Sequence, residues 1–267
     1  LFWTRVGDDP FGRYLERTLA DYGLPTRFIE RDGEAKTTVA FVTHDETGDR
    51  EFTFYRDDTA DTRLEPGRID DQTLADCEWV HAGGVTLSSG SARTATLELL
   101  ERAAAAGCTI SFDPNWRPEL WPDEQAFAST VGDALAHVDV CFATAAELEA
   151  LGASGESPTE IARAAIDGGA VHTVFVTRGS EGAVAVASDD AAWPTATVAH
   201  RGFAVDAVDT TGAGDAFVAG AIAALRDGRD LAAAVAFANA VAATATTARG
   251  AMAALPTRDA VDQLLEE

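Results

Sequence analysis

The sequence predicts an α/β protein in which short buried strands alternate with helices. Compact runs of β-branched and apolar residues, such as Thr173–Thr177 and Ala183–Ala187, have the length and composition of buried strands. Between such runs lie segments with helical spacing, such as Ala92–Ala106, which Gly107 ends. The chain shows neither internal repeats nor a linker. We therefore expect a single domain, residues 1–267, with helices packed on a sheet.

The first part of the chain predicts a helix followed by a hairpin. The helix is expected at about Gly12–Tyr22. Two β-rich runs, Thr37–Thr43 and Glu51–Tyr55, flank a polar turn cluster at residues 44–49, which is the pattern of a β-hairpin. Further strands are expected at Trp79–Gly84, Thr109–Phe112, His137–Ala143 and His200–Val205, and further helices at Ile161–Ile166, Ala216–Leu225 and Leu231–Thr247.

The composition is strongly acidic. The net charge is −24, and Lys36 is the only lysine among 20 lysine and arginine residues. Binding to a phosphate backbone needs a basic surface, so this charge argues against a nucleic-acid partner. Because high salt screens the repulsion among carboxylates, we expect a protein adapted to a halophilic cytoplasm. An acidic protein from an ordinary cytoplasm is the alternative.

The cysteines and the apolar segments bear on the compartment. The three cysteines, Cys77, Cys108 and Cys141, lie far apart without a Cys-x-x-Cys pair, which favours buried thiols in a reducing compartment. Residues 231–248 carry no charge but are mostly alanine and include Asn239, so we interpret them as a buried helix and not as a membrane span. No secretory signal opens the chain. We expect a cytoplasmic protein without a membrane partner.

A glycine-rich turn before the helix at Ala216–Leu225 is the main candidate site. Gly212 and Gly214 flank Ala213, so the backbone there can turn tightly and approach a ligand. Free N–H groups at the positive end of a helix form a site for a phosphate-like anion. Asp215 lies at the same site, where its carboxylate can take a proton from a hydroxyl nucleophile while the amides stabilise a phosphoryl group.

The residues Asp-Thr-Thr-Gly-Ala-Gly-Asp-Ala-Phe at 209–217 resemble the C-terminal signature of the ribokinase-like (PfkB) sugar and nucleoside kinases. The resemblance implies a three-layer α/β/α sandwich with a small β-sheet lid, here the hairpin at about residues 35–57. It implies that Asp215 is the catalytic base and that Gly212, Ala213 and Gly214 form the anion hole. The alternative is a glycine-rich strand-to-helix turn with an ordinary acidic cap. In the family a first central strand and a Gly-Gly/Ala-Asn sugar-binding stretch come earlier, so we expect an N-terminal strand to be missing.

Two further stretches resemble sugar-site segments of the family. The run Phe-Tyr-Arg at 54–56, followed by Ala60-Asp61, resembles the fructokinase branch and implies that Phe54 and Arg56 face the substrate. The run Asp-Pro-Asn-x-Arg-x-x-Leu-Trp at 113–121 resembles fructokinases and 2-keto-3-deoxygluconate kinases and makes Arg117 a candidate binder of substrate or phosphate. A lid strand with a solvated arginine, and a salt bridge that fixes the loop, are the alternatives. In the run Trp79–Gly84, a short strand leads into a loop, so Gly83 and Gly84 are expected beyond the carboxyl end of a strand, where ligands bind in open α/β sheets.

The nucleotide and cation candidates follow from the same resemblance. They are Thr177, Gly179 and Gly182 in a nucleotide-side loop, Thr211, Gly212 and Gly214 in the signature, and Asn239 in the wall of the adenine pocket. Glu147 is a candidate for a water-mediated Mg²⁺ contact or, equally, an acid in the first turn of a helix. Thr144 stands where many family members have asparagine. Asp209, with Thr211 and Gly250, is a candidate K⁺ site.

These observations predict an ATP-dependent kinase that phosphorylates a primary hydroxyl of a sugar, with fructose preferred. 2-Keto-3-deoxygluconate kinase is the close alternative and a nucleoside kinase the third. A non-catalytic sugar or nucleotide binder on the same fold is the alternative from another class. We expect ATP and Mg²⁺ as cofactors, K⁺ as a further cation, and small molecules as partners. By resemblance, the lid forms a homodimer.

Overall fold

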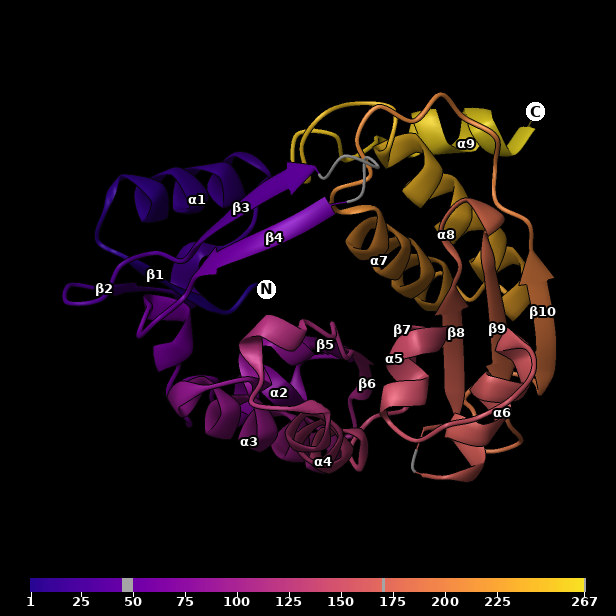
Figure 1. Cartoon of the computed structure of the whole chain (residues 1–267), viewed down its shortest axis with the longest axis horizontal. Helices are drawn as coiled ribbons and strands as arrows, with labels where there is room; N and C mark the ends of the chain where they lie inside the picture. Colours follow the sequence, from indigo (N-terminus) through magenta and orange to yellow (C-terminus); the bar gives the residue numbers. More distant parts are fainter. Residues whose placement is uncertain (45–49, 170, 267) are drawn as a thin grey trace. The chain divides into compact units, whose positions relative to one another are not determined.

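The computed structural model describes residues 1–44, 50–169 and 171–266 (Figure 1). The chain divides into two compact units, which are described separately. The first comprises Leu1–Ile110 and Asn115–His137, and the second comprises Ser111–Pro114 and Val138–Glu267.

The first unit contains two small sheets and a group of helices. Strand β1 (Thr4–Gly7) pairs in parallel with β2 (Ile29–Asp32), and β3 (Val39–His44) pairs antiparallel with β4 (Arg50–Tyr55). The predicted hairpin is therefore confirmed, although residues 45–49 of its turn cluster lie outside the described residues. The other elements are α1 (Pro10–Asp21), α2 (Asp71–Ala75), β5 (Trp79–Gly83), α3 (Gly90–Ala106) and α4 (Glu124–Leu135).

Asp9 links three segments at the end of β1. Its side chain accepts hydrogen bonds from the amides of Gly12 (2.9 Å) and Thr37 (2.8 Å) and from the Thr37 hydroxyl (2.9 Å), which itself accepts from the amide of Gly7 (2.9 Å). Burial would raise the pKa of Asp9, but these hydrogen bonds outweigh it and hold the pKa below its usual value. Because Asp9 caps the helix, α1 begins at Pro10, earlier than the sequence predicts.

The second unit is built on a mixed sheet. Its strands follow the order β6-β7-β8-β9-β10, where β6 (Thr109–Asp113) contributes its second half. The remaining strands are β7 (Val140–Thr144), β8 (Thr173–Thr177), β9 (Ala183–Ala187) and β10 (Ala196–His200). Strands β6, β7 and β8 are parallel, whereas β9 and β10 run antiparallel to their neighbours. The helices are α5 (Ala145–Ala150), α6 (Pro158–Asp167), α7 (Ala213–Arg226), α8 (Leu231–Ala245) and α9 (Arg258–Glu266).

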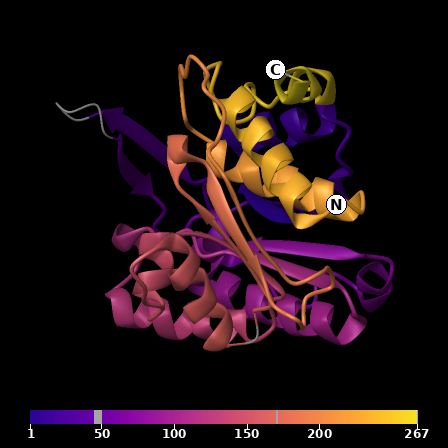
Figure 2. The same cartoon turned by 90° about the vertical axis from the view of Figure 1, so that its right-hand side faces the viewer.

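The core of the second unit joins the sheet to α7. Phe142 on β7 stacks on Phe175 on β8, with ring centroids 4.8 Å apart, and Phe217 of α7 meets both rings edge-on. Helices α7 and α8 lie side by side in both views (Figures 1 and 2). This close approach requires glycine at position 220, because a Cβ there would lie only 3.0 Å from the Cα of Ala238. The start of α7 is therefore held in place by the aromatic rings of β7 and β8 and by its packing against α8.

The predicted strand at His200–Val205 is wrong. The strand in this region, β10, ends at His200, and residues 201–206 have no regular structure. Gly202 has a φ of 78° and its amide donates to Nδ1 of His200 at 3.1 Å, so the chain turns where the sequence suggested that it stays extended. Half-buried and exposed residues alternate along β10, as expected for a strand at a sheet edge.

No helix within the described residues is long and apolar enough to cross a membrane. Helix α8, which contains the long uncharged segment, has 15 residues, of which Asn239 is buried. The segment is thus a helix packed inside the protein, as the sequence predicts.

We expect Asp9→Asn to lower the free energy of unfolding by about 1–3 kcal/mol, because the carboxamide presents a donor to three existing donors. The folded-state pKa of Asp9 lies below its unfolded value of about 3.9. Its contribution is therefore present above the unfolded pKa and is lost as the pH falls through the folded-state pKa. Urea unfolding near neutral pH and at about pH 3 measures both effects.

The control for this variant is Asp8→Asn, since the side chain of Asp8 is exposed and pairs with Arg13 on the surface. Equal losses of stability in the two variants, or a difference from wild type that persists undiminished at low pH, would contradict the assigned role of Asp9.

Candidate active site

The turn that leads into α7 carries the predicted anion site. Gly212 has a φ of 79° and immediately precedes the helix. A Cβ at this position would lie 3.0 Å from the Cβ of Ala251 and would force a conformation that side chains rarely adopt. The carbonyl oxygen of Gly212 accepts from the amide of Ala216 at 2.8 Å, which closes the first helical turn. Glycine is therefore required at 212 for both backbone conformation and space.

The three amides of the predicted anion hole differ in their partners. The amide of Ala213 donates to the carbonyl oxygen of Thr210 at 3.1 Å. The amides of Gly212 and Gly214 have no acceptor among the residues that the structure describes, and Gly214 is exposed. Two of the three amides thus remain available at the positive end of α7, and one is used to form the turn.

Asp215 lies in the first turn of α7, exposed and next to Gly214. A carboxylate near a helix N-terminus is stabilised in its charged form, which is the form that accepts a proton. Asp215 and the amides of Gly212 and Gly214 therefore meet at one helix end, as the sequence predicts. This arrangement can bind an anion and deprotonate a hydroxyl beside it.

Asp209 fixes the loop that carries this site. Its Oδ1 accepts from the amide (2.9 Å) and hydroxyl (2.7 Å) of Thr211, and its Oδ2 accepts from the amide of Gly250 at 3.0 Å. The amides of Val208 and Asp209 both donate to the carbonyl oxygen of Thr246, at 2.8 and 3.1 Å. Asp209, Thr211 and Gly250 are thus brought together as expected, with Asp209 acting as a clamp between two loops.

Glu147 closes a capping box at the start of α5. Its carboxylate accepts from the amide (2.8 Å) and hydroxyl (2.9 Å) of Thr144, and its own amide donates back to Thr144 Oγ1 at 3.3 Å. The interpretation of Glu147 as an acid in the first turn of a helix is therefore supported, and Thr144 has a capping role. Burial raises the pKa of the Cys141 thiol, and the carboxylates of Asp113 and Glu147 raise it further.

The nucleotide-side candidates occupy different environments in the second unit. Gly182 is required for packing, because a Cβ there would lie 2.0 Å from the carbonyl oxygen of His200. A Cβ at Gly179 meets nothing within 4 Å. Thr177 ends β8 and is half-buried. Asn239 is buried in α8, where its Nδ2 donates to the carbonyl oxygen of Val235 at 2.8 Å.

Arg56 follows β4 in the first unit and is held by a network that the sequence did not reveal. Only 5% of its side chain is exposed. Nε donates to Oδ2 of Asp61 at 2.7 Å, and Nη1 donates to Oγ of Ser88 at 2.6 Å. Asp61 also accepts from the hydroxyls of Thr38 and Thr59. The reading of Arg56 as a solvated arginine is therefore wrong, because the guanidinium is buried and paired.

The turn that carries Asp61 is held at the base of the hairpin. It is a short 3-10 turn, Ala60–Arg63, and the amide of Ala60 donates to the carbonyl oxygen of Lys36 at 2.9 Å. Phe54 is half-buried on β4, where it pairs with Ala40 of β3. The first unit thus brings Phe54, Arg56 and Asp61 to one end of the hairpin.

Arg117 folds back on its own loop. Its Nη1 donates to the carbonyl oxygen of Trp116 at 2.9 Å and its Nη2 to Oδ1 of Asn115 at 3.2 Å. Asn115 has a φ of 48°, which the bond from Arg117 helps to stabilise. These contacts favour a loop-fixing role. Gly83 ends β5, and its carbonyl oxygen accepts from the hydroxyl of Thr86 at 2.9 Å.

The candidate residues are divided between the two units. Phe54, Arg56, Gly83 and Arg117 belong to the first, and all the phosphate, nucleotide and cation candidates belong to the second. The sequence did not identify Thr38, Thr59 and Ser88 as partners of Arg56 and Asp61, because their spacing in the chain follows no recognisable pattern. Asp61 was part of the Ala-Asp stretch, but nothing in the sequence assigned it to Arg56. The described residues contain no cluster of three or more histidine, cysteine or acidic side chains that fits a metal ion.

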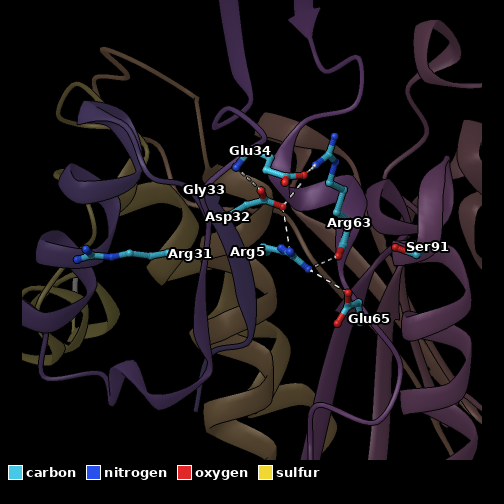
Figure 3. A pocket seen from close by; sticks show the side chains of 8 residues that line it. All are labelled: Arg5, Arg31, Asp32, Gly33, Glu34, Arg63, Glu65 and Ser91. Atoms are coloured by element: carbon cyan, nitrogen blue, oxygen red, sulfur yellow. Dashed lines mark hydrogen bonds and ion pairs between the residues drawn. The ribbon is translucent and has the colours of Figure 1, made fainter.

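A polar cavity of about 510 Å³ in the first unit contains none of these candidates. Arg5, Arg31, Asp32, Gly33, Glu34, Arg63, Glu65 and Ser91 line it (Figure 3). Arg5 pairs with Asp32 at 2.9 Å, Arg63 with Asp58, and Arg31 with Glu16. Hydrogen bonds from the amides of Ala35 and Glu34 lower the pKa of Asp32, so it stays charged opposite Arg5. The lining is thus an internally compensated ion-pair network, which we interpret as structural.

Comparison with known proteins gives the family of this chain. Residues 1–258 match the model of the pfkB family of carbohydrate kinases. The fructokinase of Vibrio alginolyticus is 36% identical over 264 residues, which cover 96% of this chain and 82% of the relative.

Two solved structures share the fold. Xylella fastidiosa fructokinase with bound ATP matches with a TM-score of 0.86 and 30% identity, over 99% of this chain and 84% of that one. Vibrio cholerae O395 fructokinase with bound fructose, ADP and calcium ion matches with a TM-score of 0.84 and 34% identity, over the same shares, 99% and 84%. The predicted ribokinase-like α/β fold is confirmed.

The two glycines of the helix N-terminus give a matched pair of variants. Gly212→Ala should lower stability by about 1–3 kcal/mol, because alanine must adopt a left-handed conformation against Ala251. Gly214→Ala should leave stability unchanged or raise it by about 0.4–1 kcal/mol, because its Cβ meets nothing within 4 Å in a helical turn. Thermal unfolding measures both, and a loss in Gly214→Ala as large as in Gly212→Ala would contradict this geometry.

Proposed function

Because the chain belongs to the pfkB family of carbohydrate kinases, we propose that Asp215 removes the proton from a primary hydroxyl of a sugar while the turn before α7 binds the phosphoryl group that is transferred. The protein is a sugar kinase, and we infer that its substrate is fructose. The observation that carries the site assignment is one helix end that holds an exposed carboxylate beside two available amides.

The chemistry we propose is in-line phosphoryl transfer. Asp215 accepts the hydroxyl proton as the sugar oxygen attacks the γ-phosphorus of ATP, and the bond from that phosphorus to ADP breaks. The amides of Gly212 and Gly214 stabilise the charge on the phosphoryl oxygens. Catalysis is then mostly positioning and electrostatics, which suits a site on a packed helix.

Our proposal for the nucleotide is that Thr177, Gly179, Gly182 and Thr211 line its phosphate and ribose side and that Asn239 supports the adenine wall. Support comes from the ATP-bound Xylella relative, which shares the fold over 99% of this chain. Gly182 and Asn239 act through packing in this proposal, because Gly182 lets the chain after β10 approach and Asn239 is buried in α8.

The cations we propose are Mg²⁺ and K⁺. Glu147 supplies a carboxylate of the kind that Mg²⁺ prefers, contacted through water. Bound there, Mg²⁺ would neutralise charge on the phosphates. Asp209 fits a K⁺ site less directly, because both its oxygens already accept hydrogen bonds. A Vibrio cholerae fructokinase variant has been solved with potassium ion bound.

For the sugar, we propose contacts from Phe54, Arg56, Gly83 and Arg117, with fructose favoured by the fructokinase relatives. 2-Keto-3-deoxygluconate remains the second candidate, because Arg117 carries a guanidinium of the kind that binds carboxylates. A nucleoside is the third candidate. The ratio of kcat/KM for fructose to that for the keto acid decides between the first two. Higher kcat/KM for the keto acid would reverse this order.

We also propose a homodimer formed through the hairpin. Phe41 and Tyr55 are 55% and 64% exposed on the hairpin, with ring centroids 5.5 Å apart. Exposed aromatic pairs of this kind are typical of interfaces. Sedimentation velocity tests the proposal, and a monomer at micromolar concentration would refute it.

For the environment, we propose a cytoplasm of high salt. The support is a net charge of −24 with a single lysine. At molar salt the Debye length is only about 3 Å, so the repulsion among surface carboxylates is suppressed. Thermal stability should therefore rise from dilute buffer to molar KCl.

Asp215→Asn should reduce kcat by ~10²–10⁴ while ATP binding is kept, because the amide no longer accepts the hydroxyl proton and the helix end is intact. Steady-state kinetics with fructose and calorimetric titration of ATP measure the two quantities. The matched control is Asp227→Asn, at the other end of α7, where the carboxylate pairs with Arg258 on the surface. If turnover in Asp215→Asn stayed within tenfold of wild type, Asp215 would not be the base.

A further inference from the structure

One nitrogen of the Arg56 side chain is buried without a partner. Nη2 has no hydrogen-bond acceptor among the described residues, whereas Nε donates to Asp61 and Nη1 donates to Ser88 at 2.6 Å and to Ser89 at 3.5 Å. A buried donor without an acceptor is unfavourable, and native structures rarely keep one without a reason. An oxygen of a bound molecule would satisfy Nη2.

The neighbours of Nη2 decide which oxygen fits. A guanidinium binds a carboxylate best through two parallel N–H groups, from Nε with Nη2 or from Nη1 with Nη2. Asp61 occupies Nε, at 2.7 Å, and the two N–H groups of Nη1 face the hydroxyls of Ser88, at 2.6 Å, and Ser89, at 3.5 Å. Each pair has therefore lost one member. Nη2 is left to donate its two N–H groups to separate oxygens, such as those of hydroxyl or keto groups.

Asp61 also sets the charge around Nη2. Its carboxylate is held in place by the hydroxyls of Thr38 and Thr59, the latter at 2.8 Å. Arg56 and Asp61 together carry no net charge. A substrate carboxylate placed on Nη2 would meet a guanidinium that is already neutralised, with the like charge of Asp61 close by.

We propose that Asp61 is a positioning residue that orients and neutralises Arg56, so that this end of the hairpin selects neutral sugars over sugar acids. The proposal rests on the sugar-kinase function and on Arg56 as a sugar contact. The hydroxyls of Thr38, Thr59 and Ser88 complete the arrangement by fixing both members of the pair.

The test is Asp61→Asn, measured with fructose and with 2-keto-3-deoxygluconate. The carboxamide leaves the charge of Arg56 uncompensated and weakens the bond to Nε. We expect KM for fructose to rise about tenfold with a smaller change in kcat, and the ratio of kcat/KM for fructose to that for the keto acid to fall at least about tenfold. Thermal shifts induced by each sugar without ATP give the same comparison without turnover.

Two further variants separate positioning from general stability. Asp58→Asn makes the same chemical change nearby, where the carboxylate is exposed and pairs with Arg63, and it should leave the ratio unchanged. In an Arg56→Gln background, Asp61→Asn should alter the ratio less than twofold, because the group through which it acts is gone.

The outcomes are distinct. Equal losses for both substrates in Asp61→Asn, or an undiminished effect in the Arg56→Gln background, would overturn the proposal and leave Asp61 a structural residue. A wild-type preference for the keto acid would also overturn it, while leaving the sugar-kinase function intact. A wild-type protein that phosphorylates neither sugar would instead overturn the choice of substrate on which the proposal rests.

Discussion

The left-handed turn at Gly212 is the constraint on which the candidate site depends. It directs the chain into α7 with the amides of Gly212 and Gly214 left available, and it leaves no room for a side chain beside Ala251. The clamp formed by Asp209, between the amides of Thr211 and Gly250, prevents this turn from relaxing. Glycine adopts this left-handed conformation without strain, whereas a residue with a side chain would be strained in it.

The helix that carries the site is held as firmly as its first turn. Phe217, only two residues after Asp215, packs on the stacked rings of Phe142 and Phe175. Further along α7, Gly220 allows α8 to pack closely against the helix. An electrostatic site works best when its dipoles do not reorganise during the reaction, and close packing supplies that rigidity.

Much of the second unit could be predicted because its signals are local. The bounds of strands β8 and β9 match the prediction. Both strands are continuous apolar runs, as expected for strands that are buried on both faces of a sheet, so their ends are easily recognised in the sequence. The turn before α7 was predictable because glycine is needed there. The end of β10 was not, because a bond between Gly202 and His200 outweighs the strand-like composition that follows.

The polar networks of the first unit were beyond prediction for a different reason. Thr38 and Ser88 reach the Arg56–Asp61 pair from distant parts of the chain, and Thr37 reaches Asp9 in the same way. Such contacts exist only once the fold has formed, and hydroxyl residues carry no pattern that marks them in advance. A resemblance could point to Arg56 as a substrate contact, but only the structure shows that its guanidinium donates a hydrogen bond to Asp61.

The position of Lys36 has a practical consequence. Its backbone is bonded to the turn that carries Asp61, its side chain is exposed, and no other lysine exists in the sequence. An amine-reactive fluorophore would therefore label one side chain at the base of the hairpin, apart from the terminal amine. Changes in its emission would report on sugar binding from within the first unit, without any cysteine having to be introduced or removed.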